Sequence, residues 1–341
     1  MKRLIFPGPH RVIFEEFQTP PVSELHVQVR SEYSLVSNGT ERTVFQGRFA
    51  SGTHWDRWVQ YPFSPGYATV GNVVETGPGV SLIRVGQRVA IRAPHASHHV
   101  VGERACIPIP DQVDFEDAVW FALAKIGFLG TWVGELKLGT SVLIVGGGPV
   151  AQVLVRWLAS SGAGLLGVLS RDPARLQKAK AGGATVTIVG HTSDCSPNTI
   201  ERGLGERPQI VFDCTDSPDV LTWALGVVAD YGRIVLVGDP GTPNERRLTS
   251  DVLLRSITVI GMHDRNTLRG WTGHTISKLF FERLSMGSFS VDGLCTHSFV
   301  PGDASNAYAL LDSRQTGVLG IRFDWRDEKG VGTENALACE L

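Results

Sequence analysis

Cysteine is scarce in this sequence, and the few copies follow no framework pattern. The 341 residues include five cysteines, and no two of them have C-x-x-C spacing. An odd number of widely scattered cysteines suits neither a disulfide scaffold nor a structural zinc lobe. We therefore interpret all five as reduced thiols: Cys106, Cys195, Cys214, Cys295 and Cys339.

Long apolar runs and an excess of either charge are also missing. No apolar stretch approaches the roughly 18–20 residues of a membrane-spanning helix. The basic residues of Met1–Gly8 are not followed by the apolar stretch of a signal peptide. The 32 basic and 34 acidic residues give a net charge of −2, which offers no basic surface to nucleic acid or a membrane. We expect a cytoplasmic protein whose partner is a small-molecule substrate, with no nucleic acid and no membrane bound.

What is present is an ordinary globular composition in a chain long enough for two domains. Before Phe115, short β-branched stretches such as Leu25–Val29, Thr69–Val74 and Val85–Ile91 are separated by glycine and proline turns, which is typical of a small β-barrel. After it, a helix is expected over Glu116–Gly134, and apolar strands then alternate with helices to about residue 263. This alternation indicates a parallel sheet covered on both faces.

The expected elements after residue 134 can be given in order. The strands are Ser141–Val145, Leu165–Leu169, Gln209–Asp213, Arg233–Val237 and Thr258–Met262, and the helices between them are Val150–Ser160, Pro173–Ala181 and Pro218–Val228. The remainder predicts two more helices and a strand, at Thr275–Met286, Ala304–Leu311 and Val318–Phe323.

A glycine-rich turn follows the first of these strands. Gly146, Gly148 and Ala151 form a G-x-G-x-x-A pattern that ends the strand and opens a helix at Pro149 and Val150. The first glycine permits a tight turn, the second lets the backbone approach a pyrophosphate, and the alanine keeps the helix close to the strand. The helix N-terminus then faces the anion. The sequence predicts a dinucleotide site, and the alternative is a glycine turn without a ligand.

The end of the second strand indicates which nicotinamide coenzyme is bound. An NAD site normally ends this strand with an acidic residue that binds the ribose 2′-hydroxyl. Here Ser170 occupies that position, followed by Arg171 and, one helical turn later, Arg175. A hydroxyl and guanidinium groups would bind a 2′-phosphate, so the sequence favours NADPH. Asp172 is the competing candidate, although it falls two residues late, and ordinary surface charge is the alternative for the arginines.

At this point the chain resembles the medium-chain dehydrogenase/reductase superfamily over nearly its whole length. The matching motifs, besides the glycine turn, are Asn38–Glu41, Gly66–Gly71, Val85–Val89, Asp213–Pro218 and Gly232–Gly238. The resemblance implies an α/β fold with two domains. A GroES-like β-barrel formed by residues 1–125 and completed by 265–341 would flank a doubly wound Rossmann domain at 126–264.

The resemblance also carries expectations about coenzyme contacts and assembly. Cys214, Val237 and Gly238 lie in its last two motifs and are expected to contact NADPH or NADP+. Family members are often joined through the edge of the Rossmann sheet, so a homodimer is expected. The Ser37–Arg42 run is similar to the branch that includes bacteriochlorophyllide hydroxyethyl dehydrogenase and sugar-related two-domain oxidoreductases, which act on secondary alcohols and ketones.

Departures from the family pattern point to a member without zinc. Zinc-dependent members carry cysteine, histidine and glutamate ligands where this sequence has Asn38, Tyr67 and Ala68, and a further ligand near Ala122. None of these replacements supplies the nitrogen or sulfur ligands that zinc prefers. A substitute cluster at His95, His98 and His99 lacks an acidic or thiol partner nearby in sequence. We expect no bound metal.

Without a metal, the substrate oxygen must be polarised by hydrogen-bond donors, and a side chain must supply a proton. Thr40 is the first candidate, because it aligns with the family's proton-relaying hydroxyl. Tyr67 could direct a phenol into the cleft, Asn38 could donate an amide N–H, and Lys125 could act as an acid if burial lowers its pKa. A turn residue, a packing aromatic or a solvated lysine are the respective alternatives. Glu41 is expected only to orient Thr40 or its neighbour Arg42.

The sequence therefore predicts an NADPH-dependent, zinc-independent oxidoreductase that interconverts a secondary alcohol and a ketone. One alternative is reduction of an activated C=C or C=N bond, and another is an NADPH-binding protein without catalysis. The aromatic stretch Phe49–Trp58 is interpreted as a lid over a ring-shaped or apolar substrate, or as a loop packed on its own barrel.

Overall fold

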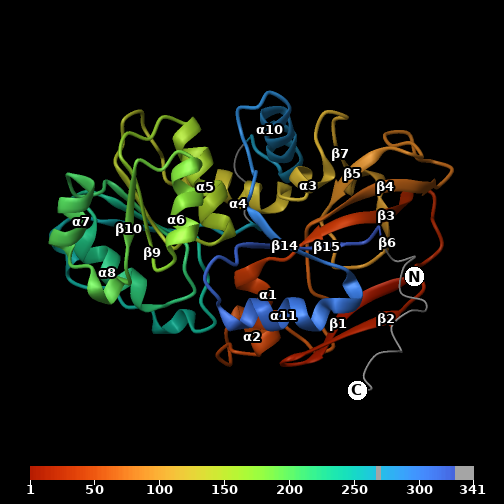
Figure 1. The fold of residues 1–341 in the computed structure, drawn as a ribbon, viewed down its shortest axis with the longest axis horizontal. Coiled ribbons are helices and arrows are strands. Elements are labelled where there is room, and N and C mark those ends of the chain that lie inside the picture. The colour runs from red at the N-terminus through yellow and green to blue at the C-terminus, as the bar shows by residue number, and fades with distance from the viewer. Residues whose placement is uncertain (266–269, 327–341) are drawn as a thin grey trace, which may run out of the picture.

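Two β-sheets form the framework of the protein, which the computed structural model describes for residues 1–265 and 270–326 (Figure 1). Within these residues, a six-stranded sheet has the order β10-β9-β8-β11-β12-β13, and a seven-stranded sheet has the order β14-β15-β3-β4-β5-β7 with β6 paired to β3. The first occupies the left of Figure 1 and the second the right.

The six-stranded sheet is parallel throughout, as its apolar strands predict. Its strands are β8 (Val142–Val145), β9 (Leu166–Ser170), β10 (Val186–Val189), β11 (Ile210–Asp213), β12 (Arg233–Leu236) and β13 (Thr258–Gly261). Its helices are α5 (Pro149–Ser160), α6 (Pro173–Ala181), α7 (Pro197–Leu204), α8 (Asp219–Val227) and α9 (Asp251–Leu254). The sequence analysis missed β10 and α7. Strand β10 lies at the sheet edge and alternates half-buried with exposed residues, so it lacks the apolar signal of its neighbours.

The seven-stranded sheet is built from both ends of the chain. Its strands are β3 (His26–Leu35), β4 (Thr69–Thr76), β5 (Arg88–Ile91), β6 (His98–Gly102), β7 (Ile107–Pro108), β14 (Cys295–Phe299) and β15 (Gly320–Asp324). The last strand, β15, pairs antiparallel with β3, opposing Arg322 to Leu35. A separate hairpin of β1 (Lys2–Gly8) and β2 (Arg11–Glu16) precedes it. We call β3–β7 with β14 and β15 the barrel, and the α/β fold is confirmed.

The other helices join or cover the two sheets. They are α1 (Asn38–Gln46), α2 (His54–Trp58), α3 (Phe115–Ala118), α4 (Phe121–Val133), α10 (Gly273–Ser285) and α11 (Ala304–Ser313). The continuous helix expected over Glu116–Gly134 is wrong, because the chain breaks between α3 and α4 and packs the fully buried Trp120 into the core. Among the described residues, no helix has the length and apolar character needed to span a bilayer.

Helix α1 occupies the segment in which a turn beside Gly39 was the alternative given for Asn38, so that alternative is wrong. Its beginning is fixed by Glu41, whose carboxylate accepts the Ser37 backbone N–H at 2.7 Å. Its end is fixed by Gly47, which takes the left-handed conformation with φ 62° that commonly ends helices. The capping-box pattern places the glutamate three residues after the serine, whereas Glu41 follows Ser37 by four, so that pattern does not reveal this helix.

The core is continuous between the barrel and the parallel sheet. Helix α4 packs against α5 so closely that a Cβ on Gly127 would lie 3.0 Å from the backbone nitrogen of Leu154. The buried Trp157 of α5 donates its indole N–H to the Ala124 carbonyl at 2.9 Å. Because burying each large aromatic side chain stabilises the fold by roughly 1.5–3 kcal/mol, this shared core fixes how the two sheets face each other.

Candidate functional site

The glycine turn after β8 has a shape that only glycine fits. Gly146 has φ 104°, and a Cβ there would lie 3.1 Å from the Cys214 carbonyl oxygen. A Cβ on Gly147 would lie 2.9 Å from the Ser170 hydroxyl, a constraint that the sequence pattern did not reveal. Gly148 precedes Pro149, the first residue of α5, and faces open space. The turn therefore leaves room beside the N-terminus of α5 for an anionic group.

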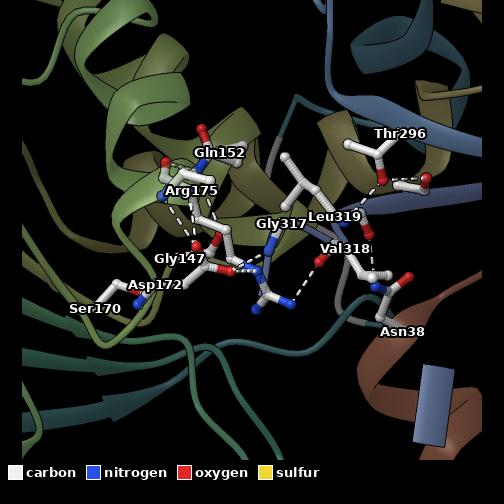
Figure 2. A network of polar contacts seen from close by, with 12 residues as sticks. Asn38, Gly147, Gln152, Ser170, Asp172, Arg175, Thr296, Gly317, Val318 and Leu319 are labelled. Carbon is white, nitrogen blue, oxygen red and sulfur yellow. Dashed lines mark hydrogen bonds and ion pairs between the residues drawn. The ribbon is translucent and has the colours of Figure 1, made fainter. Parts of the chain in front are cut away.

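Ser170 is the last residue of β9, and its side chain lies beside Gly147 of the turn. It is 8% exposed, and its hydroxyl accepts the Asp172 backbone N–H at 3.2 Å. Arg171 is exposed. Asp172 caps α6, where its Oδ1 accepts the backbone N–H groups of Ala174 at 2.9 Å and Arg175 at 3.3 Å. The carboxylate of Asp172 is thus engaged by the protein itself (Figure 2).

Arg175 is directed toward the barrel rather than toward Ser170 (Figure 2). Its Nη2 donates to the Val318 carbonyl at 2.5 Å, and its Nε lies 3.2 Å from Asp172 Oδ2. The same Asp172 oxygen accepts the Gly317 backbone N–H at 2.8 Å. Burial lowers the pKa of Arg175. The expected contact of Arg175 with a 2′-phosphate stays a prediction, and it would require these bonds to rearrange.

Asn38, at the start of α1, reaches the same segment before β15 from the other side (Figure 2). Its Nδ2 donates to the Leu319 carbonyl at 2.6 Å, while the Leu319 N–H donates to Thr296 Oγ1 at 2.9 Å. Asn38 Oδ1 is buried and has no hydrogen-bond partner among the described residues. The sequence analysis expected Asn38 to present a donor, but the atom left unpartnered is an acceptor.

Two arginines of the barrel side bind one carboxylate of the parallel-sheet side. Arg42 of α1 and Arg314 at the end of α11 both contact Asp216 Oδ2, the latter at 3.1 Å. Asp216 follows β11, in the loop whose Cys214 lies against the glycine turn. The sequence analysis missed Arg314 and Asp216, because positions 98 residues apart carry no local pattern.

Tyr67 lies at the centre of a polar cluster between the barrel and the parallel sheet. Its hydroxyl and the Ser37 hydroxyl are 2.6 Å apart. The Arg92 guanidinium lies over the Tyr67 ring, 4.4 Å from its centroid, within the range of a cation–π interaction. Burial raises the pKa of Tyr67 to about 12, although the hydrogen bond with Ser37 and the positive charge of Arg92 each lower it. The phenol is therefore protonated at neutral pH.

Lys125 joins this cluster through Asp264. Its Nζ lies 2.9 Å from Asp264 Oδ1 and donates to the Asp264 backbone carbonyl at 2.9 Å, and Arg92 forms an ion pair with the same carboxylate. Lys125 is thus ion-paired rather than a solvated lysine, and its role as a general acid stays a prediction. Arg92 and Asp264 were missed, since no motif contains them.

A pocket of about 260 Å³ opens beside Tyr67. Thr40 and Glu41 of α1 contribute to its wall, and so do the aromatic side chains of Trp58 and Phe63. Trp58 is 51% exposed and packs edge-on against Phe63, with ring centroids 5.2 Å apart. The structure therefore brings Thr40 and Tyr67 together at one pocket, while Lys125 belongs to the adjoining cluster.

The segment expected to form a lid bridges the two parts of the protein. The Trp55 indole N–H donates to the Pro240 carbonyl at 3.1 Å, and the Ala50 N–H donates to the Gly241 carbonyl at 2.9 Å. His54 Nε2 lies 2.8 Å from Asp239 Oδ2. Trp55 is also buried in the same core cluster as Phe6 and Phe323, so the segment packs on its own barrel as well, and a lid function stays a prediction. Residues 239–241 follow Val237 and Gly238, whose N–H groups both donate to the Asp213 carbonyl.

The residues present do not fit a catalytic zinc ion. Asn38, Tyr67, Ala68 and Ala122 offer no thiolate or imidazole, and no group of three His, Cys, Asp or Glu side chains within residues 1–265 and 270–326 could hold a metal. Cys214 is half-buried, and burial raises its pKa well above the ordinary value, which suits a packing role. Cys339 lies outside the described residues.

Comparison with known proteins identifies the two parts of the chain. The alcohol dehydrogenase GroES-like domain family matches residues 24–132, and the zinc-binding dehydrogenase family matches residues 149–272. The second match contains none of the four positions at which zinc ligands are replaced. An L-threonine 3-dehydrogenase from Bacillus licheniformis is 22% identical, over 93% of this chain and 97% of its own.

Solved structures share the fold over almost the whole chain. Galactitol-1-phosphate dehydrogenase from Escherichia coli superposes with a TM-score of 0.80 at 18% identity, covering 95% of this chain and 100% of its own. A dehydrogenase from Sinorhizobium meliloti 1021 bound to NADP superposes with a TM-score of 0.79 at 17% identity, covering 95% of this chain and 98% of its own. An alcohol dehydrogenase from Escherichia coli CFT073 bound to NADH superposes with a TM-score of 0.80 at 20% identity, covering 95% of this chain and 99% of its own.

These matches, with the glycine turn between a GroES-like barrel and a Rossmann sheet, define a two-domain, nicotinamide-dependent oxidoreductase. Over the two matched segments and in its overall fold, the chain is similar to alcohol dehydrogenase-like members of the medium-chain dehydrogenase/reductase superfamily. Relatives and neighbours include complexes with both coenzymes, so the choice between NADH and NADPH depends on this chain's own residues.

Asp213, at the end of β11, is a buried carboxyl next to the glycine turn. It accepts the Thr215 backbone N–H at 3.0 Å and the Thr215 hydroxyl at 2.7 Å, and Arg246 Nη2 lies 3.5 Å away. Burial raises the pKa of Asp213 to about 6. The folded protein therefore binds this proton more tightly than the unfolded chain does.

We expect the stability of the Asp213→Asn variant, measured relative to that of the wild type, to increase as the pH rises. The wild-type carboxyl stabilises the fold below its unfolded pKa, and this contribution is lost as the pH rises through about 6, costing about 2 kcal/mol between about pH 4.5 and 7.5. Thermal melts at both pH values should show the melting temperature of the variant gaining on that of the wild type. The exposed ion-paired Asp230 provides a control, Asp230→Asn, with little change. A pH-independent difference for Asp213→Asn would contradict the prediction.

Proposed function

We propose that the protein is an NADPH-dependent, zinc-independent oxidoreductase that interconverts a secondary alcohol and a ketone on a small organic substrate. The observation that carries this proposal is the placement of Tyr67. Its protonated hydroxyl lies 2.6 Å from the Ser37 hydroxyl, beside a pocket, with Arg92 over its ring. The Tyr67 hydroxyl is thus a proton donor close to the positive charge of Arg92. This tyrosine occupies the position at which zinc-dependent relatives are expected to have a ligand.

The coenzyme would be held by the glycine turn and the end of β9. The backbone at Gly146 and Gly148 and the N-terminus of α5 suit its pyrophosphate. The Ser170 hydroxyl and the exposed Arg171 suit a 2′-phosphate, and Asp172 is engaged by α6 and Gly317. The bound coenzyme supplies or accepts the hydride.

The protein's contribution to ketone reduction would be a proton and a stabilising field. Tyr67 donates its phenolic proton to the substrate oxygen as that oxygen gains negative charge, and solvent later returns a proton to the phenolate. Arg92 and Lys125 carry positive charge that favours both the developing oxyanion and the transient phenolate. In alcohol oxidation the same proton moves in the opposite direction. The Thr40 hydroxyl lines the same pocket and is a second contact for the substrate oxygen.

The pocket also bears on substrate size and on the alternatives. Its volume of about 260 Å³ is below the roughly 300–1,000 Å³ of pockets for drug-sized ligands, which favours a small substrate over a macrocycle. An open pocket beside Tyr67 supports catalysis over an NADPH-binding role alone. Reduction of a C=N bond remains the second candidate, because a carboxylate, Glu41, also lines the pocket and would favour a protonated imine.

Replacing Arg171 by alanine should separate the two coenzymes. Loss of a charge-assisted hydrogen bond to the 2′-phosphate should raise the Kd for NADPH by roughly tenfold or more and leave that for NADH nearly unchanged. Fluorescence titration of both variants with both coenzymes measures this. Arg202→Ala removes an exposed arginine from α7 and serves as the control. Equal weakening of both coenzymes, or tighter NADH binding by the wild type, would overturn the assignment.

Tyr67→Phe should lower kcat for ketone reduction by roughly 10²–10⁴-fold, because the proton donor is lost while the ring remains. The Kd for NADPH should change little. Tyr231→Phe is the matched control, since Tyr231 is 84% exposed and does not line the pocket. Steady-state kinetics with a panel of small ketones measures the effect. Unchanged kcat for Tyr67→Phe, or one zinc ion per chain by elemental analysis, would refute the mechanism.

We also propose a homodimer formed through the free edge of the parallel sheet. Strand β13 ends that sheet within the described residues, and α9 just before it exposes Leu253 (85%) and Leu254 (80%). Large exposed apolar side chains beside a sheet edge are typical of an interface. Light scattering should give a dimer for the wild type and a monomer for Leu254→Glu. The exposed Leu138 gives the control Leu138→Glu, and a monomeric wild type would disprove the proposal.

A further inference from the structure

Glu41 has a buried carboxylate and is one of the residues that line the pocket beside Tyr67. It is 1% exposed, and three groups from separate segments contact it. Its Oε1 accepts the Ser37 backbone N–H at 2.7 Å, and its Oε2 accepts the Tyr308 hydroxyl at 2.6 Å. His95 Nε2 lies 3.0 Å from the same Oε2. A carboxylate that only accepts hydrogen bonds is the ionised form.

A chain of hydrogen bonds assigns the neutral form to His95. The Trp325 indole can only donate, and it donates to Ser34 Oγ at 2.8 Å. The Ser34 hydroxyl then donates its own hydrogen to His95 Nδ1, 2.7 Å away. The remaining ring proton lies on Nε2 and is donated to Glu41. A protonated His95 would leave the Ser34 hydroxyl hydrogen without an acceptor among the described residues.

The result is a buried negative charge without a positive partner. Among the described residues, no lysine or arginine forms an ion pair with Glu41; its neighbour Arg42 is directed to Asp216. Burying an ionised carboxylate is costly unless a cation compensates it. Because Glu41 is one of the residues that line the pocket, a cationic ligand there would lie close to this charge.

The rest of the pocket has the composition that binds ammonium groups. Trp58 and Phe63 present aromatic rings at the same opening as Glu41, and aromatic faces attract cations. Within residues 1–265 and 270–326, no lysine or arginine lines the pocket. The positive groups of the site, Arg92 and Lys125, are both paired with Asp264, and neither is among the described residues that line the pocket. The site thus has a positive end at Tyr67 and a negative end at Glu41.

We propose that the pocket binds a positively charged amine, so that the substrate is a small amino alcohol or amino ketone. Its ammonium group lies between Glu41 and the rings of Trp58 and Phe63, and its carbonyl or hydroxyl oxygen reaches Tyr67. This substrate class rests on the proposed oxidoreductase function for the reaction, but the binding of the cation does not depend on turnover.

The binding test compares two ligands of the same shape. Choline carries a quaternary ammonium, and 3,3-dimethylbutan-1-ol replaces its nitrogen by carbon. Calorimetry on the full chain at constant ionic strength should show choline binding at least tenfold more tightly. Equal affinities, or preference for the neutral alcohol, would overturn the proposal.

Variants locate the preference at this pocket. Glu41→Gln should abolish the preference for choline, and the control Glu103→Gln, which removes another buried carboxylate remote from the pocket, should retain it. Should Glu41→Gln fail to fold, Trp58→Leu tests the same pocket from its exposed rim and should reduce choline binding about tenfold. Unchanged choline binding in Trp58→Leu would place the cation elsewhere and refute the proposal.

Turnover distinguishes this inference from the proposed function. With NADP+, 1-aminopropan-2-ol should be oxidised with a higher kcat/KM than butan-2-ol by the wild type, and Glu41→Gln should reverse that order. Oxidation of butan-2-ol in preference, without preferential choline binding, would refute the amine inference and leave the alcohol dehydrogenase function intact. Preferential choline binding without any alcohol turnover would support the binding of an amine and refute the alcohol dehydrogenase function.

Discussion

Polar contacts that cross from the barrel to the parallel sheet are the constraint on which the site depends. Arg42 binds Asp216, Arg92 and Lys125 bind Asp264, and Arg175 binds the Val318 carbonyl. Each contact joins a side chain on one part of the chain to a group on the other. Because the candidate pocket and the glycine turn belong to different sheets, their relative position is only as well defined as these contacts and the core beneath them.

The parts of the site that the sequence revealed are those formed within a few residues. The turn from Gly146 to Gly148 follows a strand and begins a helix, and the φ of 104° at Gly146 is a local requirement that a G-x-G pattern reports directly. The departures at Asn38 and Tyr67 were visible by resemblance. The pairing of Arg92 with Asp264 and of His95 with Glu41 could not be recognised, since the partners lie 172 and 54 residues apart and no periodicity links them.

The fold was predictable where strands are buried on both faces and less so at their edges. Strands β8, β9, β11 and β12 are apolar runs and were expected within a residue or two. Edge strand β10 and helix α1 were missed, because their stability comes from neighbours and from the Glu41 carboxylate rather than from their own composition.

The pairing of β15 with β3 has a consequence for how the polypeptide is made. Strand β3 ends at Leu35, but its hydrogen-bonding partner at residues 320–324 is nearly the last described part of the chain to be synthesised. On a ribosome, the parallel sheet can therefore form while the barrel still has an open edge. Its completion must wait until residues 320–324 have left the ribosome, and exposed β3 edges of nascent molecules are where mispairing between neighbouring chains would begin.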